Sequence, residues 1–173
     1  MLLALIRIER LIRLPPEACI PRQFLKESEK LARNAQEVYS KFDTVFESIR
    51  KNANETADAF AESFGIAGST ARELLGTTGD LLVGMGATEE QALTLSKEVN
   101  TLAADLASFS NIEGGTARAS AALTKALLGE RESAKLLGIV LRETDIQQRL
   151  LEKGQKDLTG QALLLAKAQV TLE

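Results

Sequence analysis

The sequence predicts an all-α fold in which a long, coiled-coil-like N-terminal helix precedes a glycine-punctuated bundle of short helices. Hydrophobic residues make up 45% of the 173 residues, and many recur at helical spacing. None of the 12 glycines precedes Gly65, and all three prolines lie within the first 21 residues. Because glycine and proline interrupt helices, this distribution divides the chain into residues 1–21, 22–64 and 65–173.

Residues 1–14 are predicted to form a short apolar helix that carries Arg7, Arg10 and Arg13 along one side. Pro15 ends this helix because proline cannot donate a backbone hydrogen bond. The segment differs from a secretory signal, since its positive charges follow the apolar start. We expect its leucines to pack against this protein or a second copy, and membrane contact is the alternative.

Residues 22–64 contain no glycine or proline, so we expect one long amphipathic helix of about 60 Å. Two rows of residues repeat every seven positions, offset by three and four, which is the pattern of a coiled-coil seam. The strong central part of this seam consists of Leu31, Val38, Phe42, Val45 and Ile49. Burying these side chains contributes roughly 1.5–3 kcal/mol each. We therefore expect self-association into a homo-oligomer through them, or folding back onto residues 65–173.

Residues 65–173 are predicted to form short helices that begin at capping residues and end at glycines. Ser69 is expected to cap the first of these helices, which runs to Leu75. Thr88 and Gln91 form a capping box for the next helix. The apolar residues expected near one face of that helix are Leu93, Val99, Leu102, Leu106 and Phe109.

The rest of this segment continues the same alternation of helices and turns. After a turn at Gly114, helices are expected over 117–128 and 130–137, ended by Gly129 and Gly138. Residues 139–141 form the only β-branched run that suits an extended backbone. The last two predicted helices span 145–154, capped by Asp145, and 161–172.

No residue pattern points to catalysis, a cofactor or a metal. Histidine is absent and Cys19 is the only cysteine, which excludes histidine-dependent triads, internal disulfides and zinc knuckles. The pairs Glu89–Glu90 and Glu130–Glu132 stand at predicted helix starts, where negative charge is favourable. We therefore predict that the chain is not an enzyme, with no catalytic, cofactor-binding or metal-ligating residue.

The remaining motifs also have simple structural interpretations. Gly76 and Gly79, like Gly84 and Gly86, resemble pieces of phosphate loops but lack the required lysine, so we expect them to end helices. The phenylalanines at helical spacing are expected to pack inside the protein; they are Phe42, Phe46, Phe60 and Phe64. With a net charge of -3 and 4% aromatic residues, we expect no sequence-specific nucleic-acid partner.

Three ordered strings resemble the tail tape measure proteins of long-tailed bacteriophages and prophages. Leu81–Leu93 resembles a family segment of two helical turns, a loop and a capped helix. Leu102–Asn111 is similar to the recurrent Leu-Ala-x-Asp-Leu-Ala-Ser-Phe-x-Asn string. Ala122–Leu141 resembles a string that runs from Ala-Leu-x-x-Ala-Leu-x-Gly-Glu to Leu-Gly-Ile. Family members are usually several times longer, so the resemblance implies that the chain corresponds to an N-terminal portion.

The resemblance implies a structural role in the virion. Tape measure proteins are made in the host cytoplasm and act inside the tail tube, where their length sets tail length and tube subunits polymerise around them. Tail assembly chaperones bind them, and they leave the tube before DNA ejection. The alternative function is that of a membrane-active helical protein that inserts residues 1–14 into the host envelope.

Overall fold

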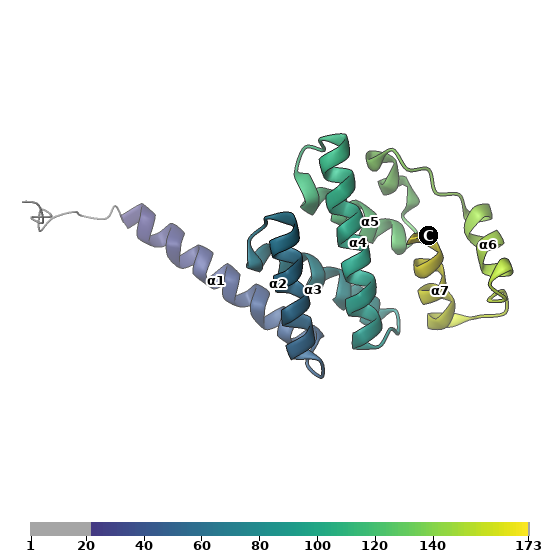
Figure 1. The fold of residues 1–173 in the computed structure, drawn as a ribbon, viewed down its shortest axis with the longest axis horizontal. Helices are drawn as coiled ribbons and strands as arrows, with labels where there is room; N and C mark the ends of the chain where they lie inside the picture. Colours follow the sequence, from purple (N-terminus) through teal and green to yellow (C-terminus); the bar gives the residue numbers. More distant parts are fainter. Residues whose placement is uncertain (1–21, 173) are drawn as a thin grey trace, which may run out of the picture. The chain divides into compact units, whose positions relative to one another are not determined.

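The computed structural model describes residues 22–172, and this part of the chain is entirely α-helical in class, as predicted (Figure 1). It contains seven α-helices and one 3-10 helix, with no strand among the described residues. The helices are α1 (Arg22–Val45), α2 (Arg50–Phe64), α3 (Gly68–Gly84), α4 (Glu89–Ser110), α5 (Gly115–Leu127), the 3-10 helix η1 (Arg131–Leu137), α6 (Glu143–Glu152) and α7 (Gly160–Leu172). The helix predicted over residues 1–14 lies outside the described residues.

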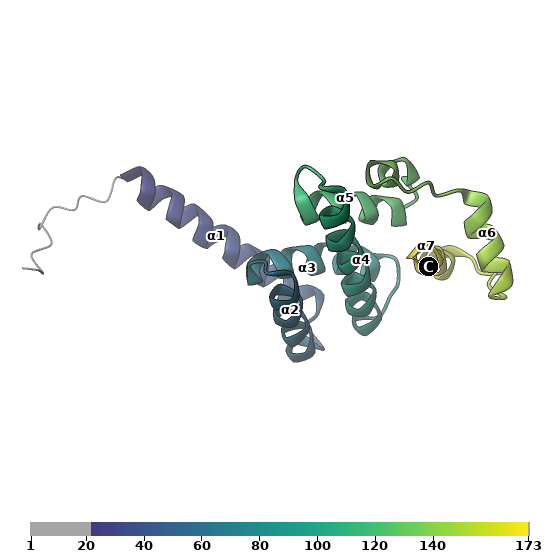
Figure 2. The ribbon, with the colours of Figure 1, turned by 45° about the horizontal axis from the view of Figure 1, so that its top comes forward.

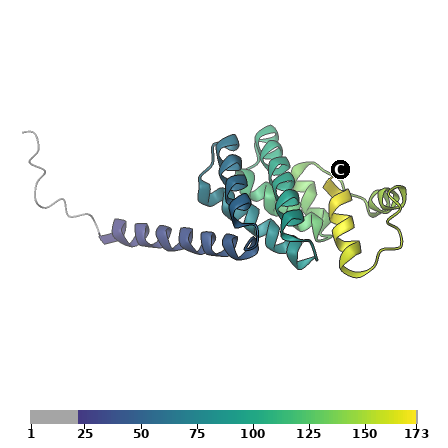
Figure 3. The same cartoon turned by 60° about the horizontal axis from the view of Figure 1, so that its bottom comes forward.

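The described residues divide into two units at residue 35, so that residues 22–35 belong to the first unit and residues 36–172 to the second. The second unit contains one principal hydrophobic cluster, to which the end of α1 and all the later helices except α6 contribute. Within this unit the helices pack largely in chain order, with α2 on α3, α3 on α4, α4 on α5 and α5 on η1 (Figures 1 and 3). The division predicted at residue 65 is therefore wrong, because residues before and after it share one core.

The single helix predicted over residues 22–64 is also wrong, because α1 ends at Val45 and α2 begins at Arg50. Phe46 is fully buried within the turn, and a distant acid holds the turn in place. The backbone N–H and the hydroxyl of Ser48 both donate to Oε2 of Glu89 at the start of α4, at 2.9 and 2.8 Å. These contacts come from another helix, so the local absence of glycine and proline did not reveal the turn.

Two glycines inside α3 allow α1 to approach it closely. Gly76 and Gly79 were expected to end helices, but both lie in the helix interior and are buried. A β-carbon added to Gly76 would lie 3.4 Å from Cδ2 of Phe42, and one added to Gly79 would lie 2.4 Å from Cζ of Phe46. The two phenylalanine rings pack edge to face, with 5.0 Å between their centroids. The missing side chains of α3 therefore make room for the aromatic end of α1.

The predicted capping signals of the later helices are largely confirmed. Thr88 Oγ1 accepts from the N–H of Gln91, and the Gln91 side chain accepts from the N–H of Thr88. Gly129, which follows the C-cap Leu128 of α5, and Gly138, the C-cap of η1, both have positive φ angles. As a result, helices occupy most of the ranges that the sequence predicted.

Four local predictions need correction. Ser69 does not cap α3, because Ala67 is its N-cap, and α6 begins at Glu143 before the expected cap Asp145. Residues 139–141 form no strand and link η1 to α6 without regular structure. Phe109 is 92% exposed, because it lies about 200° around α4 from the buried Ala107.

The C-terminal hairpin of α6 and α7 has a small core of its own, made of Ile146, Leu150, Ala166 and Val170. Helix α7 also contacts α4 and α5, so that it lies between α6 and the principal cluster (Figure 2). The unit thus consists of a main helical stack and a satellite hairpin.

Candidate functional site

The five residues of the predicted seam do not form one free surface. Phe42 is only 1% exposed and belongs to the principal cluster of its own chain. Val45 and Ile49 are partly buried against the same cluster. Leu31, by contrast, is 70% exposed, and Val38 is half-buried. The C-terminal half of the seam folds back within the chain, and self-association stays a prediction for the N-terminal half.

A buried arginine that the sequence analysis did not identify holds this end of α1 against α2 and α3. Arg72 lies under the ring of Tyr39, with its guanidinium carbon 4.8 Å from the ring centroid. Its Nε donates to Asn54 Oδ1 at 3.0 Å, and its Nη2 pairs with Asp58 Oδ1 at 2.8 Å. The planar guanidinium thus satisfies partners on several elements at once, which a lysine could not do.

A second missed group is a polar network inside the main stack. The Asn100 side chain is fully buried, and its Nδ2 donates to the Ser96 carbonyl at 2.8 Å and to Thr78 Oγ1 at 3.2 Å. Its Oδ1 accepts from the Ser120 hydroxyl at 2.6 Å. The amide therefore joins α3, α4 and α5, and it fixes their register because a shifted helix would leave buried polar atoms without partners.

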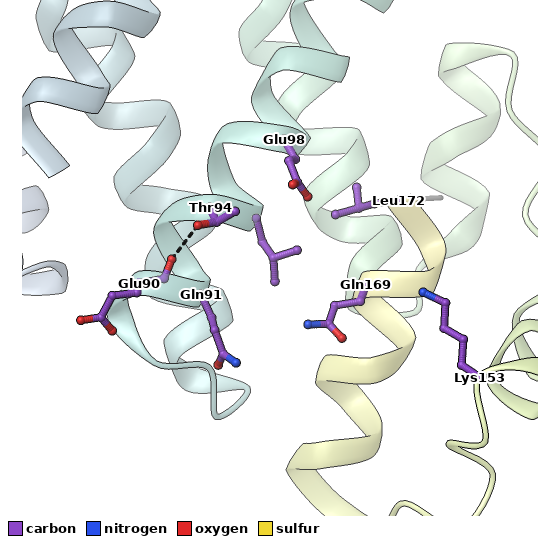
Figure 4. A pocket seen from close by; sticks show the side chains of 8 residues that line it. Glu90, Gln91, Thr94, Glu98, Lys153, Gln169 and Leu172 are labelled. Atoms are coloured by element: carbon purple, nitrogen blue, oxygen red, sulfur yellow. Dashed lines mark hydrogen bonds between the residues drawn. The ribbon is translucent and has the colours of Figure 1, made fainter. Parts of the chain in front are cut away.

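An open groove of about 470 Å³ is lined by residues of α4 and α7, which contact each other beside it (Figure 4). Figure 4 shows Glu90, Gln91, Thr94 and Glu98 on α4 and Gln169 and Leu172 on the neighbouring α7, with the Glu90 side chain directed away from α7. Lys153, which follows α6, completes the rim, and Leu95 adds an apolar side chain. The groove is therefore an interhelical depression with amide, acidic and apolar side chains.

The acids of this groove are poorly placed for joint chemistry. Glu90 and Glu98 are eight residues apart on one helix, which separates their backbone positions by about 12 Å. Paired carboxylates that cleave a glycosidic bond stand roughly 5–9.5 Å apart. Within residues 22–172, no set of three or more metal-ligating side chains of histidine, cysteine, aspartate or glutamate lies together. The groove therefore offers a mixed polar and apolar surface for contact.

A charged cluster links the hairpin to the rest of the unit. The Glu143 carboxylate accepts from Nζ of Lys167 on α7 at 2.8 Å and pairs with Arg131 of η1. The hydrogen bond from Lys167 lowers the pKa of Glu143, against the opposing effect of partial burial, and bonding to Gln147 and the charge of Arg131 lower it further. The lowered pKa means that Glu143 stays ionised at pH values at which an ordinary glutamate side chain begins to be protonated.

None of the described helices has the length and apolar character needed to cross a membrane. No family model, curated protein or solved structure matches the chain.

Proposed function

We propose that this chain is a structural, scaffold-type protein of phage tail assembly, corresponding to an N-terminal portion of a tape measure protein. In this role it would set tail length, template tail-tube polymerisation and leave the tube at genome ejection. Its partners would be other copies of the chain, tail-tube subunits and tail assembly chaperones. It would be made in the host cytoplasm and would act inside the tail tube.

The observation that carries this proposal is the position of the three family-like strings. Leu81–Leu93 spans the end of α3, a short loop and the capped start of α4, which is the local structure that the resemblance implies. Leu102–Asn111 forms the second half of α4, and Ala122–Leu141 covers most of α5, η1 and the residues that follow. The strings therefore occupy the helices that pack together at the centre of the unit, rather than scattered surface segments.

The physical properties of the chain suit this role. A helix rises by about 1.5 Å per residue, so an extended helical chain converts residue number into length. Mixed charges along α1 and an exposed Leu31 suit contact between copies held side by side. The described polar clusters at Arg72 and Asn100 each hold helices together.

Tail length provides the test. The segment 143–172 should be deleted in frame in one variant and duplicated in another, in the genome that encodes the chain. In the proposed role the hairpin of α6 and α7 would be extended into one continuous helix inside the tube, so tails measured by electron microscopy should become about 45 Å shorter and about 45 Å longer, respectively. Glu132→Gln, which preserves residue number, serves as the control and should leave tail length unchanged. Normal tails of unchanged length in both variants would refute the proposal.

A further inference from the structure

The two faces of α7 have different partners, and this makes α7 the bridge between the hairpin and the main stack. Ala166 and Val170, four residues apart on one face, pack with Ile146 and Leu150 of α6. The face that carries Leu165, Ala168 and Leu172 packs against the principal cluster. Since α6 packs chiefly on α7, the hairpin holds together by its own core and rests on the main stack through one helix face.

The link between η1 and α6 provides a natural pivot. Ile139 packs against the principal cluster, whereas the next residue, Val140, is 63% exposed. Residues 139–142 lack regular secondary structure. Rotation about the backbone after Ile139 would therefore leave the main stack and the hairpin core intact.

One ion pair fastens the two sides of this pivot. Arg131 lies on η1, before the link, and it pairs with Glu143, the first residue of α6 after the link. Glu143 also bonds to Lys167, which lies within the hairpin, so that this second contact moves with it. Nε of Arg131 is buried without a hydrogen-bond partner, and therefore the guanidinium is only partly compensated where it lies.

We infer that α6 and α7 form a hinged flap, which opens as one unit about residues 140–142 and is latched to η1 by the Arg131–Glu143 pair. Opening separates Leu165, Ala168 and Leu172 from the principal cluster and uncovers the apolar side of the main stack that α7 covers. Few apolar contacts hold the flap, so it opens at a lower free energy than α3, α4 and α5 unfold. This inference does not depend on the proposed function.

Amide hydrogen exchange on the full chain tests the hinge. In the wild-type protein, amides of α6 and α7 should exchange faster than those of α3, α4 and α5, and the two hairpin helices should respond together. Arg131→Gln should accelerate exchange in the hairpin alone by about two- to fivefold, the factor that corresponds to a partly exposed ion pair. Raising the salt concentration should accelerate hairpin exchange in the wild type and have a smaller effect in Arg131→Gln.

Lys135→Gln is the matched control. Lys135 is also a cation on η1, but it pairs with Glu132 of the same short helix. Its loss should leave hairpin exchange unchanged. The inference is overturned if α6 and α7 exchange as slowly as α4, if only one of them accelerates, or if the two variants have the same effect. It is also overturned if Arg131→Gln accelerates exchange throughout the unit.

Discussion

The two interior glycines of α3 allow a paired test of how closely α1 approaches it. Both are helical and buried, so replacing either by alanine gains about 1 kcal/mol of helix propensity. At Gly76 the new methyl group would make an ordinary contact, at 3.4 Å from the Phe42 ring. At Gly79 it would lie 2.4 Å from Cζ of Phe46, which is fully buried and cannot swing away into solvent. Such overpacking costs about 1–3 kcal/mol.

We therefore expect Gly76→Ala to raise the free energy of unfolding by about 0.5–1 kcal/mol. Gly79→Ala should lower it by up to about 2 kcal/mol, once the gain in propensity is subtracted from the overpacking cost. Chemical denaturation measures both values. Phe46→Leu shortens the clashing ring, so it should destabilise the protein less in the Gly79→Ala background than in the wild type. If both alanine variants gain the same stability, or if Phe46→Leu is strictly additive with Gly79→Ala, the close packing of α1 on α3 is refuted.

Three further predictions address the buried network, the charged cluster and the seam. Asn100→Ala should lower the free energy of unfolding by about 2–4 kcal/mol, because it leaves a cavity and buried polar groups without partners. As a control, replacing the exposed Asn52 by alanine should change it by less than about 0.5 kcal/mol in the same denaturation assay. Glu143→Gln should be less stable than the wild type at neutral pH. Because folding lowers the pKa of Glu143, the difference in stability should shrink as the pH falls from the ordinary glutamate value of about 4.5 through the lowered pKa of the folded protein. Melting curves recorded from pH 7 to 3 measure this difference. Sedimentation equilibrium should detect association of the wild type at high concentration and its loss in Leu31→Ser, and an unchanged association in that variant would exclude this part of the seam.

Much of the fold could be predicted because many helix boundaries are determined by residues that lie close together in the sequence. The capping box at Thr88 and Gln91 needs residues only three positions apart, and both of its hydrogen bonds form as expected. Gly129 and Gly138 likewise end their helices through a backbone conformation that other residues adopt at a cost. Capping signals of this kind involve only a few consecutive residues, so the sequence alone can reveal them.

The missed features depend on residues that are distant in the sequence. The turn between α1 and α2 forms where Ser48 meets Glu89, 41 positions later. Gly79 has a role only because Phe46 packs on it, and Arg72 gains its partners from α1 and α2. A seven-residue repeat identifies which residues avoid water, but it does not distinguish a second copy of the chain from another part of the same chain. This ambiguity explains why the predicted seam includes Phe42, which packs in the core of its own chain.

The division of the seam has a consequence for the proposed assembly role. With Phe42 in its own core, the exposed part of the seam depends mainly on Leu31 and the half-buried Val38. Burying both side chains on each of two copies supplies less than about 12 kcal/mol, because Val38 is already half-buried, whereas association in solution costs roughly 4–15 kcal/mol in lost freedom of motion. Free chains should therefore associate weakly. In the proposed role, copies confined side by side in a tube would already have lost most of that freedom, because confinement raises the effective concentration of one copy around another. In the proposed role, a weak seam would favour contact between copies inside an assembling tail while leaving free chains separate before assembly begins.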